Sequence, residues 1–185
     1  VRIVLNGAGA AGIACLELLK SMGAKHDNCL MCDTKGVIYQ GRTEGMNQWK
    51  SAHAVKTDRR TLADALDGAD VFFHVASPFL MLEQMTEPEK DVFEPARLGT
   101  GHVIDAINGA ESVKRLVLTS TVGAIFGDYS DVHDQMGGVL SERYFNTTST
   151  RENNPSHYAK TVAAQMAWQA QAAPDRRSMG AINTG

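Results

Sequence analysis

The chain has 185 residues, of which 43% are hydrophobic and 21% charged, and its formal net charge is −3. A chain of this length usually forms one domain with one core, and its charge balance gives no basis for binding nucleic acid or an anionic membrane. No apolar run approaches the ~20 residues of a membrane span, and the chain opens on an apolar segment with no signal peptide, so we expect a cytoplasmic protein.

Short apolar runs alternate with amphipathic stretches along the first half of the chain. We expect strands at 1–6 and 29–32, and helices at 11–22 and 61–66 with Thr61 as N-cap. Between them, residues 34–56 contain three glycines that interrupt any long element, although 37–40 fits a short strand. A segment of this length with little regular structure is typical of a functional loop or an insertion.

The second half continues the alternation of strand and helix. We expect strands at 71–76, 115–120 and 179–182, helices at 89–108 and 156–171, and a polar surface loop at 128–154. Strands that alternate with helices predict a parallel sheet covered on both faces.

The three cysteines are Cys15, Cys29 and Cys32, an odd number that indicates reduced thiols. Cys29 and Cys32 form a C-x-x-C pair, the spacing of redox and zinc sites. They fall inside a short apolar segment, however, and no second C-x-x-C or H-x-x-H completes a metal site. We therefore expect buried small hydrophobic residues and no metal.

A glycine motif follows the first strand directly and opens the first helix. Gly7 permits a tight turn, Gly9 lets the backbone approach a pyrophosphate, and Gly12 lets the helix pack on the strand. The N–H groups of Ala10 and Ala11 lie in the first helical turn, whose dipole favours phosphate. The alternative is a glycine-rich turn that binds nothing.

An acidic residue ends the second strand, 21 residues after Gly12. This residue, Asp33, is placed to accept hydrogen bonds from the adenosine ribose hydroxyls. Its charge would repel a 2′-phosphate, which favours NAD, while Lys35 would soften that preference and leaves NADP as the alternative cofactor. The sequence thus predicts an α/β, Rossmann-type doubly wound parallel sheet in three layers, with strand order 3-2-1-4-5, in a single dinucleotide-binding domain spanning 1–185.

The chain resembles two families in succession. Residues 1–72 resemble the NAD-binding domain of bacterial malic enzymes in the stretches NGAGAAGIA, MCDTKGVIYQGRTEGMN and TLADALDGADVF. Residues 71–185 resemble extended short-chain dehydrogenase/reductases of the dihydroflavonol-reductase and epimerase type in VFFHVASPF, EKDVFEPARLGTGHVIDA, VKRLVLTSTVGAIFG and YAKTVAAQMAW. Both families pass from a helix into a buried strand at 69–72. The resemblance implies a chimera of a 1–72 half and a 73–185 half, most simply an engineered one; the alternative is a natural chain with a coincidental mixture.

The resemblances also imply what the chain lacks. The metal ligands and catalytic residues of malic enzymes lie in segments that have no counterpart here, so malate decarboxylation is not expected. The reductase resemblance ends at Gly185, where that family continues into a substrate-binding region. We therefore expect much of the substrate pocket to be missing.

The reductase resemblance implies a catalytic hydroxyl, tyrosine and lysine. Thr121, with Ser120 beside it, takes the hydroxyl position, and Lys160 matches the lysine that would hold the nicotinamide ribose. Ser156 stands where the tyrosine is expected, four residues before the lysine. Tyr158 is only two residues from Lys160, about 200° around a helix, so we expect proton transfer to be crippled.

Two further features have a functional and a plain structural interpretation. Ala76 ends the strand at 71–76, and Ser77 and Pro78 follow it where this family's backbone passes the cofactor, so Ala76 and Ser77 are candidate cofactor contacts. Ser77 and Pro78 also fit a plain strand-ending turn. Lys160 is either a ribose contact or a solvated lysine on an amphipathic helix.

The leading hypothesis is an NAD(P)-binding domain of oxidoreductase ancestry with weak or absent catalysis. The alternatives are an active carbonyl or alcohol oxidoreductase with Tyr158 repositioned, and a designed scaffold that binds no ligand. The expected partners are a dinucleotide, a small carbonyl or alcohol substrate and, for a homodimer rather than a monomer, a second copy contacted through 90–108 and 156–171. No nucleic acid or membrane partner is expected.

Overall fold

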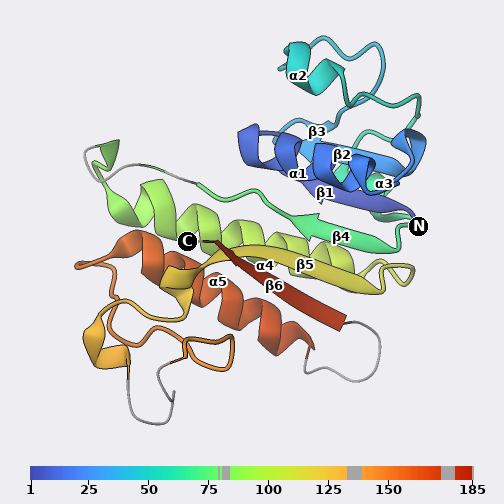
Figure 1. Ribbon diagram of the computed structural model, residues 1–185. Helices are drawn as coiled ribbons and strands as arrows, with labels where there is room; N and C mark the ends of the chain where they lie inside the picture. The colour runs from blue at the N-terminus through green and yellow to red at the C-terminus, as the bar shows by residue number, and fades with distance from the viewer. Residues whose placement is uncertain (79, 81–83, 133–138, 172–177, 185) are drawn as a thin grey trace. The chain divides into compact units, whose positions relative to one another are not determined.

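The computed structural model describes residues 1–78, 80, 84–132, 139–171 and 178–184 (Figure 1). The chain divides into two compact units. Unit 1 comprises Val1–Ala76, Asp105–Val117 and Asp175–Gly180, and unit 2 comprises Ser77–Ile104, Leu118–Pro174 and Ala181–Gly185. The single domain with two halves stays a prediction. In the described part of the chain, no helix is both long and apolar enough to cross a membrane.

The sheet of unit 1 has the strand order β3-β2-β1-β4-β5-β6, and this confirms the predicted Rossmann-type order. Central β1 pairs in parallel with both of its neighbours, so that Ile3 lies opposite Cys29 on one side and Val71 on the other. The first parts of the last two strands belong to unit 1 and their ends to unit 2. The strand bounds are β1 Ile3–Asn6, β2 Cys29–Asp33, β3 Gly36–Val37, β4 Val71–His74, β5 Arg115–Thr121 and β6 Ser178–Thr184.

One edge of the sheet differs from the all-parallel prediction. Strand β3 pairs antiparallel with β2, with Cys32 opposite Val37 and Asp33 opposite Gly36. Only Thr34 and the next residue separate the two strands, and so short a connection permits a hairpin but no parallel crossover.

The rest of the irregular segment contains a short helix that the sequence did not predict. Helix α2, Gln48–Ser51, is a single turn whose N-cap Asn47 accepts a hydrogen bond from the Lys50 N–H at 2.8 Å. So short a helix has no apolar periodicity by which the sequence would reveal it.

The longer helices of unit 1 lie within a residue of their predicted bounds. Helix α1 spans Ala10–Ser21, and α3 spans Leu62–Leu66. The predicted N-cap Thr61 accepts from the Asp64 N–H, and the Asp64 carboxylate accepts from the Thr61 N–H in return. This capping box fixes where α3 begins.

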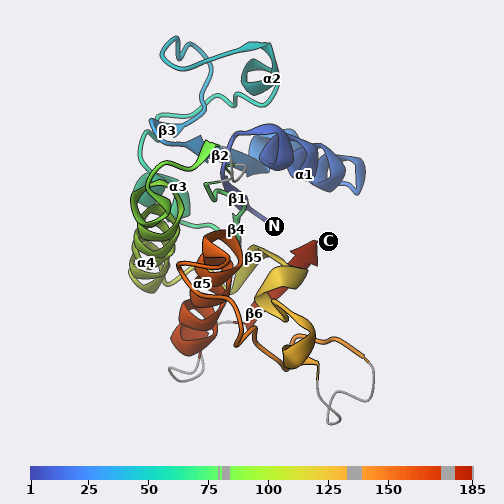
Figure 2. The same ribbon diagram turned by 90° about the vertical axis from the view of Figure 1, so that its left-hand side faces the viewer.

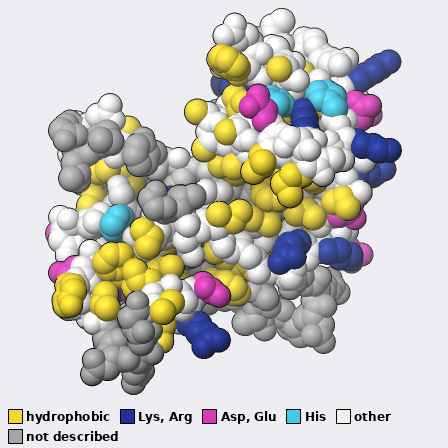
Figure 3. Space-filling model, viewed as in Figure 1, with side chains coloured by type: hydrophobic (Ala, Val, Ile, Leu, Met, Phe, Trp, Pro, Cys, Tyr) yellow, Lys and Arg dark blue, Asp and Glu magenta, His cyan; other side chains and the backbone are white. Residues whose placement is uncertain are grey.

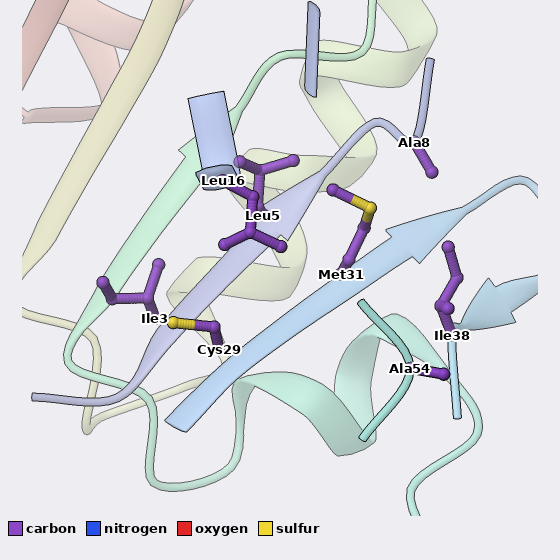
Figure 4. Packing of buried hydrophobic residues seen from close by; sticks show 8 residues of the cluster. All are labelled: Ile3, Leu5, Ala8, Leu16, Cys29, Met31, Ile38 and Ala54. Atoms are coloured by element: carbon purple, nitrogen blue, oxygen red, sulfur yellow. The ribbon is translucent and has the colours of Figure 1, made fainter. Parts of the chain in front are cut away.

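One hydrophobic cluster of unit 1 gathers side chains of α1, β1, β2 and the segment after β3 (Figure 4). Leu16 of α1 and Leu5 of β1 are fully buried, and Met31 of β2 joins them. Cys29 and Cys32 are buried free thiols, as predicted, and burial raises the pKa of Cys32 to about 12.

Unit 2 is built on two helices, α5, Pro155–Gln171, and most of α4, Glu94–Asn108, which lie side by side (Figures 1 and 2). The predicted helix 89–108 is α4 preceded by a π-helical turn at Glu89–Phe93. The turn, α4 and α5 share an apolar cluster of buried residues, which contains Val92, Phe93, Ala96 and Ala159.

A buried carboxylate organises the loop that follows β5. Asp131 accepts hydrogen bonds from the Gly127 N–H at 2.7 Å, from the N–H and hydroxyl of Thr147 at 2.8 and 2.5 Å, and from the Thr148 hydroxyl at 2.6 Å. Burial by itself would raise the pKa of Asp131, but these hydrogen bonds outweigh it and hold the pKa well below its usual range. The predicted polar loop 128–154 is therefore anchored from inside, although 133–138 lie outside the described residues.

A matched pair on α1 tests the core of unit 1. Leu16→Ala removes a fully buried side chain and should lower the free energy of unfolding by about 3 kcal/mol. Leu18 lies on the same helix but is 61% exposed, so Leu18→Ala should change the free energy of unfolding by less than about 0.5 kcal/mol. Urea denaturation followed by circular dichroism measures both, and equal effects would contradict the described packing.

Candidate functional site

The glycine turn of unit 1 is closed by a backbone contact that admits no side chain. Gly7 has a φ of 123°, and a Cβ at this position would lie 2.6 Å from the backbone nitrogen of Ala76. The Gly7 N–H donates to the carbonyl of Cys32 at 2.8 Å, and the Ala76 N–H donates to that of Asn6 at 2.8 Å. The turn is thus tied to the strands on both sides of β1.

The other two glycines differ in what surrounds them. A Cβ at Gly12 would lie 1.7 Å from the Gly7 carbonyl oxygen, so this glycine allows α1 to approach the turn. A Cβ at Gly9 would meet nothing within 4 Å, so the backbone there faces open space.

The N-terminus of α1 is free to bind an anion. Gly9 is the N-cap, no side chain caps this end, and the first turn contains no acidic residue. Ala10 and Ala11 are exposed. The first N–H groups of a helix have no intrahelical acceptor, and together with the helix dipole they favour a phosphate. The residues present therefore fit the pyrophosphate of a dinucleotide.

Asp33, at the end of β2, lies inside a clamp of two cations. Its carboxylate accepts from the Arg42 guanidinium at 2.8 and 3.0 Å and from the Lys50 ammonium at 2.6 Å. The Lys35 N–H donates to the same carboxylate at 2.9 Å. The Asp33 side chain is 10% exposed and that of Arg42 4%. We call Asp33, Arg42 and Lys50 the Asp33 clamp.

The electrostatics of the clamp keep Asp33 ionised. Burial by itself would raise the pKa of Asp33, but the hydrogen bonds from Lys50 and Arg42 outweigh it and lower the pKa below its usual value. Lys35, which the sequence predicted to soften the preference for NAD, forms an ion pair with Glu44 at 2.9 Å.

Sequence reasoning missed both cationic members of the clamp. They stand 9 and 17 residues after Asp33, in the segment without periodicity. The Arg42 guanidinium also donates to the carbonyls of Gly36, Val37 and Glu44, so the backbone of the segment positions it. The only available signal was the presence of basic residues after Asp33.

Unit 2 contains the residues implied by the reductase resemblance. Thr121 ends β5, and its hydroxyl accepts from the Gly123 N–H at 3.3 Å. The Lys160 ammonium of α5 donates to the carbonyl of Thr119 at 3.2 Å, and burial lowers the pKa of Lys160. Lys160 is thus a half-buried side chain directed to β5, not a fully solvated surface lysine.

The two candidates for the proton donor lie on α5 as well. Ser156 is half-buried, one turn before Lys160. The Tyr158 ring stacks on Phe93, with centroids 5.3 Å apart, and the Arg151 guanidinium lies 6.0 Å from the Tyr158 ring centroid. The structure thus places Tyr158 in the apolar cluster of unit 2 and Lys160 against β5.

Two further residues, Ser77 and His157, lie near the elements described above. Ser77 is half-buried, and its hydroxyl donates to the Pro78 carbonyl at 3.5 Å. Sequence reasoning missed His157, whose ring lies against Gly123: a Cβ on that glycine would be 2.5 Å from the ring. The only signal for His157 was its position three residues before Lys160.

The sequence profile of the 3-beta hydroxysteroid dehydrogenase/isomerase family matches residues 8–172, which is most of the chain. The chain belongs to the 3-beta hydroxysteroid dehydrogenase/isomerase family. The matched residues include part of the glycine turn of unit 1 and all of α5. Strand β6 lies beyond the matched residues.

Curated relatives of this family member match only part of it. It is 71% identical over 76 residues to an NADP-dependent malic enzyme of Rhizobium meliloti, and 45% identical over 76 residues to an NAD-dependent malic enzyme of the same organism. Each match covers 41% of this chain and 10% of the malic enzyme. The chain thus matches about a tenth of the length of these enzymes.

Solved structures match this family member along nearly its whole length. The NADPH complex of Gre2 from Candida albicans has a TM-score of 0.70 and 22% identity, over 99% of this chain and 57% of that one. MoeE5 in complex with UDP-glucuronic acid and NAD has a TM-score of 0.67 and 20% identity, over 99% of this chain and 54% of that one. At these identities the likeness shows the fold.

Two glycine variants separate folding from binding at the turn. Gly12→Ala forces a Cβ into the Gly7 carbonyl and should lower the free energy of unfolding by about 3 kcal/mol. Gly9→Val points into open space, so it should change stability by no more than about 1 kcal/mol while it blocks the approach of a pyrophosphate. Thermal unfolding and dinucleotide titration check the pair, and a Gly9→Val protein that binds like the parent would contradict the assignment.

Proposed function

We propose that this chain is an NAD(P)-binding domain of oxidoreductase ancestry whose own catalysis is weak or absent. The observation that supports it best is the glycine turn, in which Gly7 and Gly12 are sterically required and Gly9 faces open space at an uncapped helix N-terminus. Membership of a dehydrogenase family and the dinucleotide complexes of its structural neighbours agree with this proposal.

The Asp33 clamp suggests that the site takes NADP as well as NAD. The preference for NAD expected from the sequence requires an available carboxylate, whereas Asp33 is neutralised by Arg42 and Lys50. A neutralised carboxylate repels a 2′-phosphate less, and the clamp adds two cations at the end of β2. The malic enzymes of Rhizobium meliloti, Halomonas elongata and Escherichia coli that the chain matches include ones named NADP-dependent.

We propose that the chain is a chimera of two Rossmann halves, most simply an engineered one. The high identity to malic enzymes covers 41% of the chain, whereas the dehydrogenase profile matches 8–172. The resemblance changes families at 69–72, just before the first segment of unit 1 ends at Ala76.

We expect weak catalysis because α5 lacks a tyrosine at the position of the proton donor. When bound, the cofactor would supply or accept a hydride, and a small carbonyl or alcohol compound would be the substrate. Thr121 offers a hydroxyl and Lys160 an ammonium close to the end of β5. Ser156 replaces the phenol that would exchange the proton, and a serine hydroxyl is far too weak an acid for that role.

Titration with NADH and NADPH, followed by cofactor fluorescence, tests the binding proposal. We expect saturable binding of both. Asp33→Asn removes the negative charge and leaves Arg42 and Lys50 uncompensated, so it should tighten NADPH by about fivefold relative to NADH. Lys35→Gln, outside the clamp, is the control and should change this ratio less. No binding at millimolar cofactor by the folded protein would refute the proposal.

Restoring the phenol tests the account of catalysis. Ser156→Tyr should raise NAD(P)H-dependent reduction of small aldehydes by about 100-fold, the usual contribution of a general acid. Tyr158→Phe is the matched control and should leave the rate unchanged, because the Tyr158 ring packs on Phe93. Loss of the parent's turnover in Tyr158→Phe would show that this phenol acts in catalysis after all.

A further inference from the structure

A lysine and two histidines form a cluster behind the Asp33 clamp. The Lys20 ammonium, near the end of α1, lies 2.8 Å from Nδ1 of His26 and 2.8 Å from Nδ1 of His53. His53 is 4% exposed and precedes the bridge that joins Val55 to Tyr39. Figure 3 shows histidine, basic and acidic side chains gathered at the surface of unit 1 near α2.

The chemistry of the cluster fixes the state of both imidazoles. With the lysine nitrogen as the donor, each Nδ1 presents its lone pair, and this arrangement places the ring proton on Nε2. The Nε2 of His26 then donates to the Ala54 carbonyl at 3.2 Å. The Nε2 of His53 is buried without a hydrogen-bond partner, and the Glu17 carboxylate lies 3.7 Å away.

The cluster and the clamp are joined through a single turn of chain. The His53 N–H donates to the carbonyl of Lys50 at 3.0 Å, and the Lys50 ammonium reaches Asp33 at 2.6 Å. The backbone of Lys50 is thus held by the backbone of His53, and its ammonium is held by the Asp33 carboxylate. A change at His53 would act on Asp33 through this turn.

We propose that the Lys20–His26–His53 cluster positions Lys50 on Asp33 only while the His53 imidazole is neutral, so that acidification weakens the clamp and shifts the site from NADP toward NAD. The inference rests on the proposed dinucleotide binding at the same site. Asp33 without Lys50 keeps Arg42 alone, so its charge is less compensated and it repels a 2′-phosphate more.

The charges around His53 set the direction of the pH effect. Burial lowers the pKa of His53, and Lys20 and then His26 lower it further, while Glu17 of α1 opposes them. Burial also lowers the pKa of Lys20, against Cys29 of β2 and Glu17, and an uncharged lysine amine would still donate to both imidazoles.

The sign of the stability effect follows from this lowered pKa. Because the pKa of His53 in the folded protein lies below the value near 6.5 of an unfolded histidine, the unfolded chain binds more protons below about pH 6.5. The stability contributed by the neutral cluster is therefore complete above that pH and is lost as the pH falls through the folded pKa.

The test compares the parent with His53→Asn between pH 8 and 5.5. The asparagine oxygen occupies the place of Nδ1 and accepts from Lys20, but it cannot be protonated. Calorimetric titration with NAD⁺ and NADP⁺ gives the ratio of their dissociation constants. In the parent we expect NADP⁺ to weaken about fivefold relative to NAD⁺ on acidification, beyond the change in His53→Asn. The titration of the 2′-phosphate itself is common to both proteins and cancels in the comparison.

A measurement without cofactor separates this inference from the proposed function. Nitrogen-15 NMR of the imidazoles should show both protons on Nε2 at pH 8, and amide exchange at 48–53 should quicken below pH 6.5 in the parent but not in His53→Asn. An equal pH dependence of the two proteins in both experiments, or an Nδ1–H on either histidine at pH 8, overturns the inference. Failure of both dinucleotides to bind refutes the proposed function and with it the shift of preference, whatever the imidazoles show.

Discussion

The close approach of α1 to the turn after β1 is the contact on which the dinucleotide site depends. Gly12 lies so near the Gly7 carbonyl that a single added carbon would clash at 1.7 Å, and Gly7 in turn lies against the backbone of Ala76. These two contacts bring the free N–H groups of the helix to the carboxyl end of the sheet, beside the open backbone of Gly9. The core around Leu16 holds the helix in that position.

The Asp33 clamp lies at the end of β2, where the adenosine ribose of a bound dinucleotide is expected. An acidic residue at the end of β2 is usually taken as a ribose ligand that rejects a 2′-phosphate. Here its charge is already compensated by Arg42 and Lys50, and the segment that supplies them is fastened to α1 through His53. Under the proposed function, the choice between NAD and NADP would depend on this network of charges and not on one carboxylate.

Local patterns in the sequence predicted most of the fold, whereas long-range contacts had to come from the structure. The glycine turn and the capped start of α3 each depend on residues a few positions apart, so a local sequence pattern is enough to predict them. Helical geometry likewise predicted that Tyr158 would turn away from Lys160. Arg42 and Lys50 reach Asp33 from an aperiodic segment, and no spacing rule indicates that contact. The sequence predicted a short strand at 37–40 but not its antiparallel direction, which the two-residue connection Thr34–Lys35 imposes.

We propose above all that the glycine turn of unit 1 holds the pyrophosphate of NAD or NADP. Amide chemical-shift mapping during titration with NADPH tests it most directly. The account predicts saturable shifts that are largest at Gly9, Ala10, Ala11 and Gly12, with a second group at Asp33 and Lys35. Saturable shifts that leave the turn unchanged, or no shifts at millimolar cofactor in the folded protein, would contradict it.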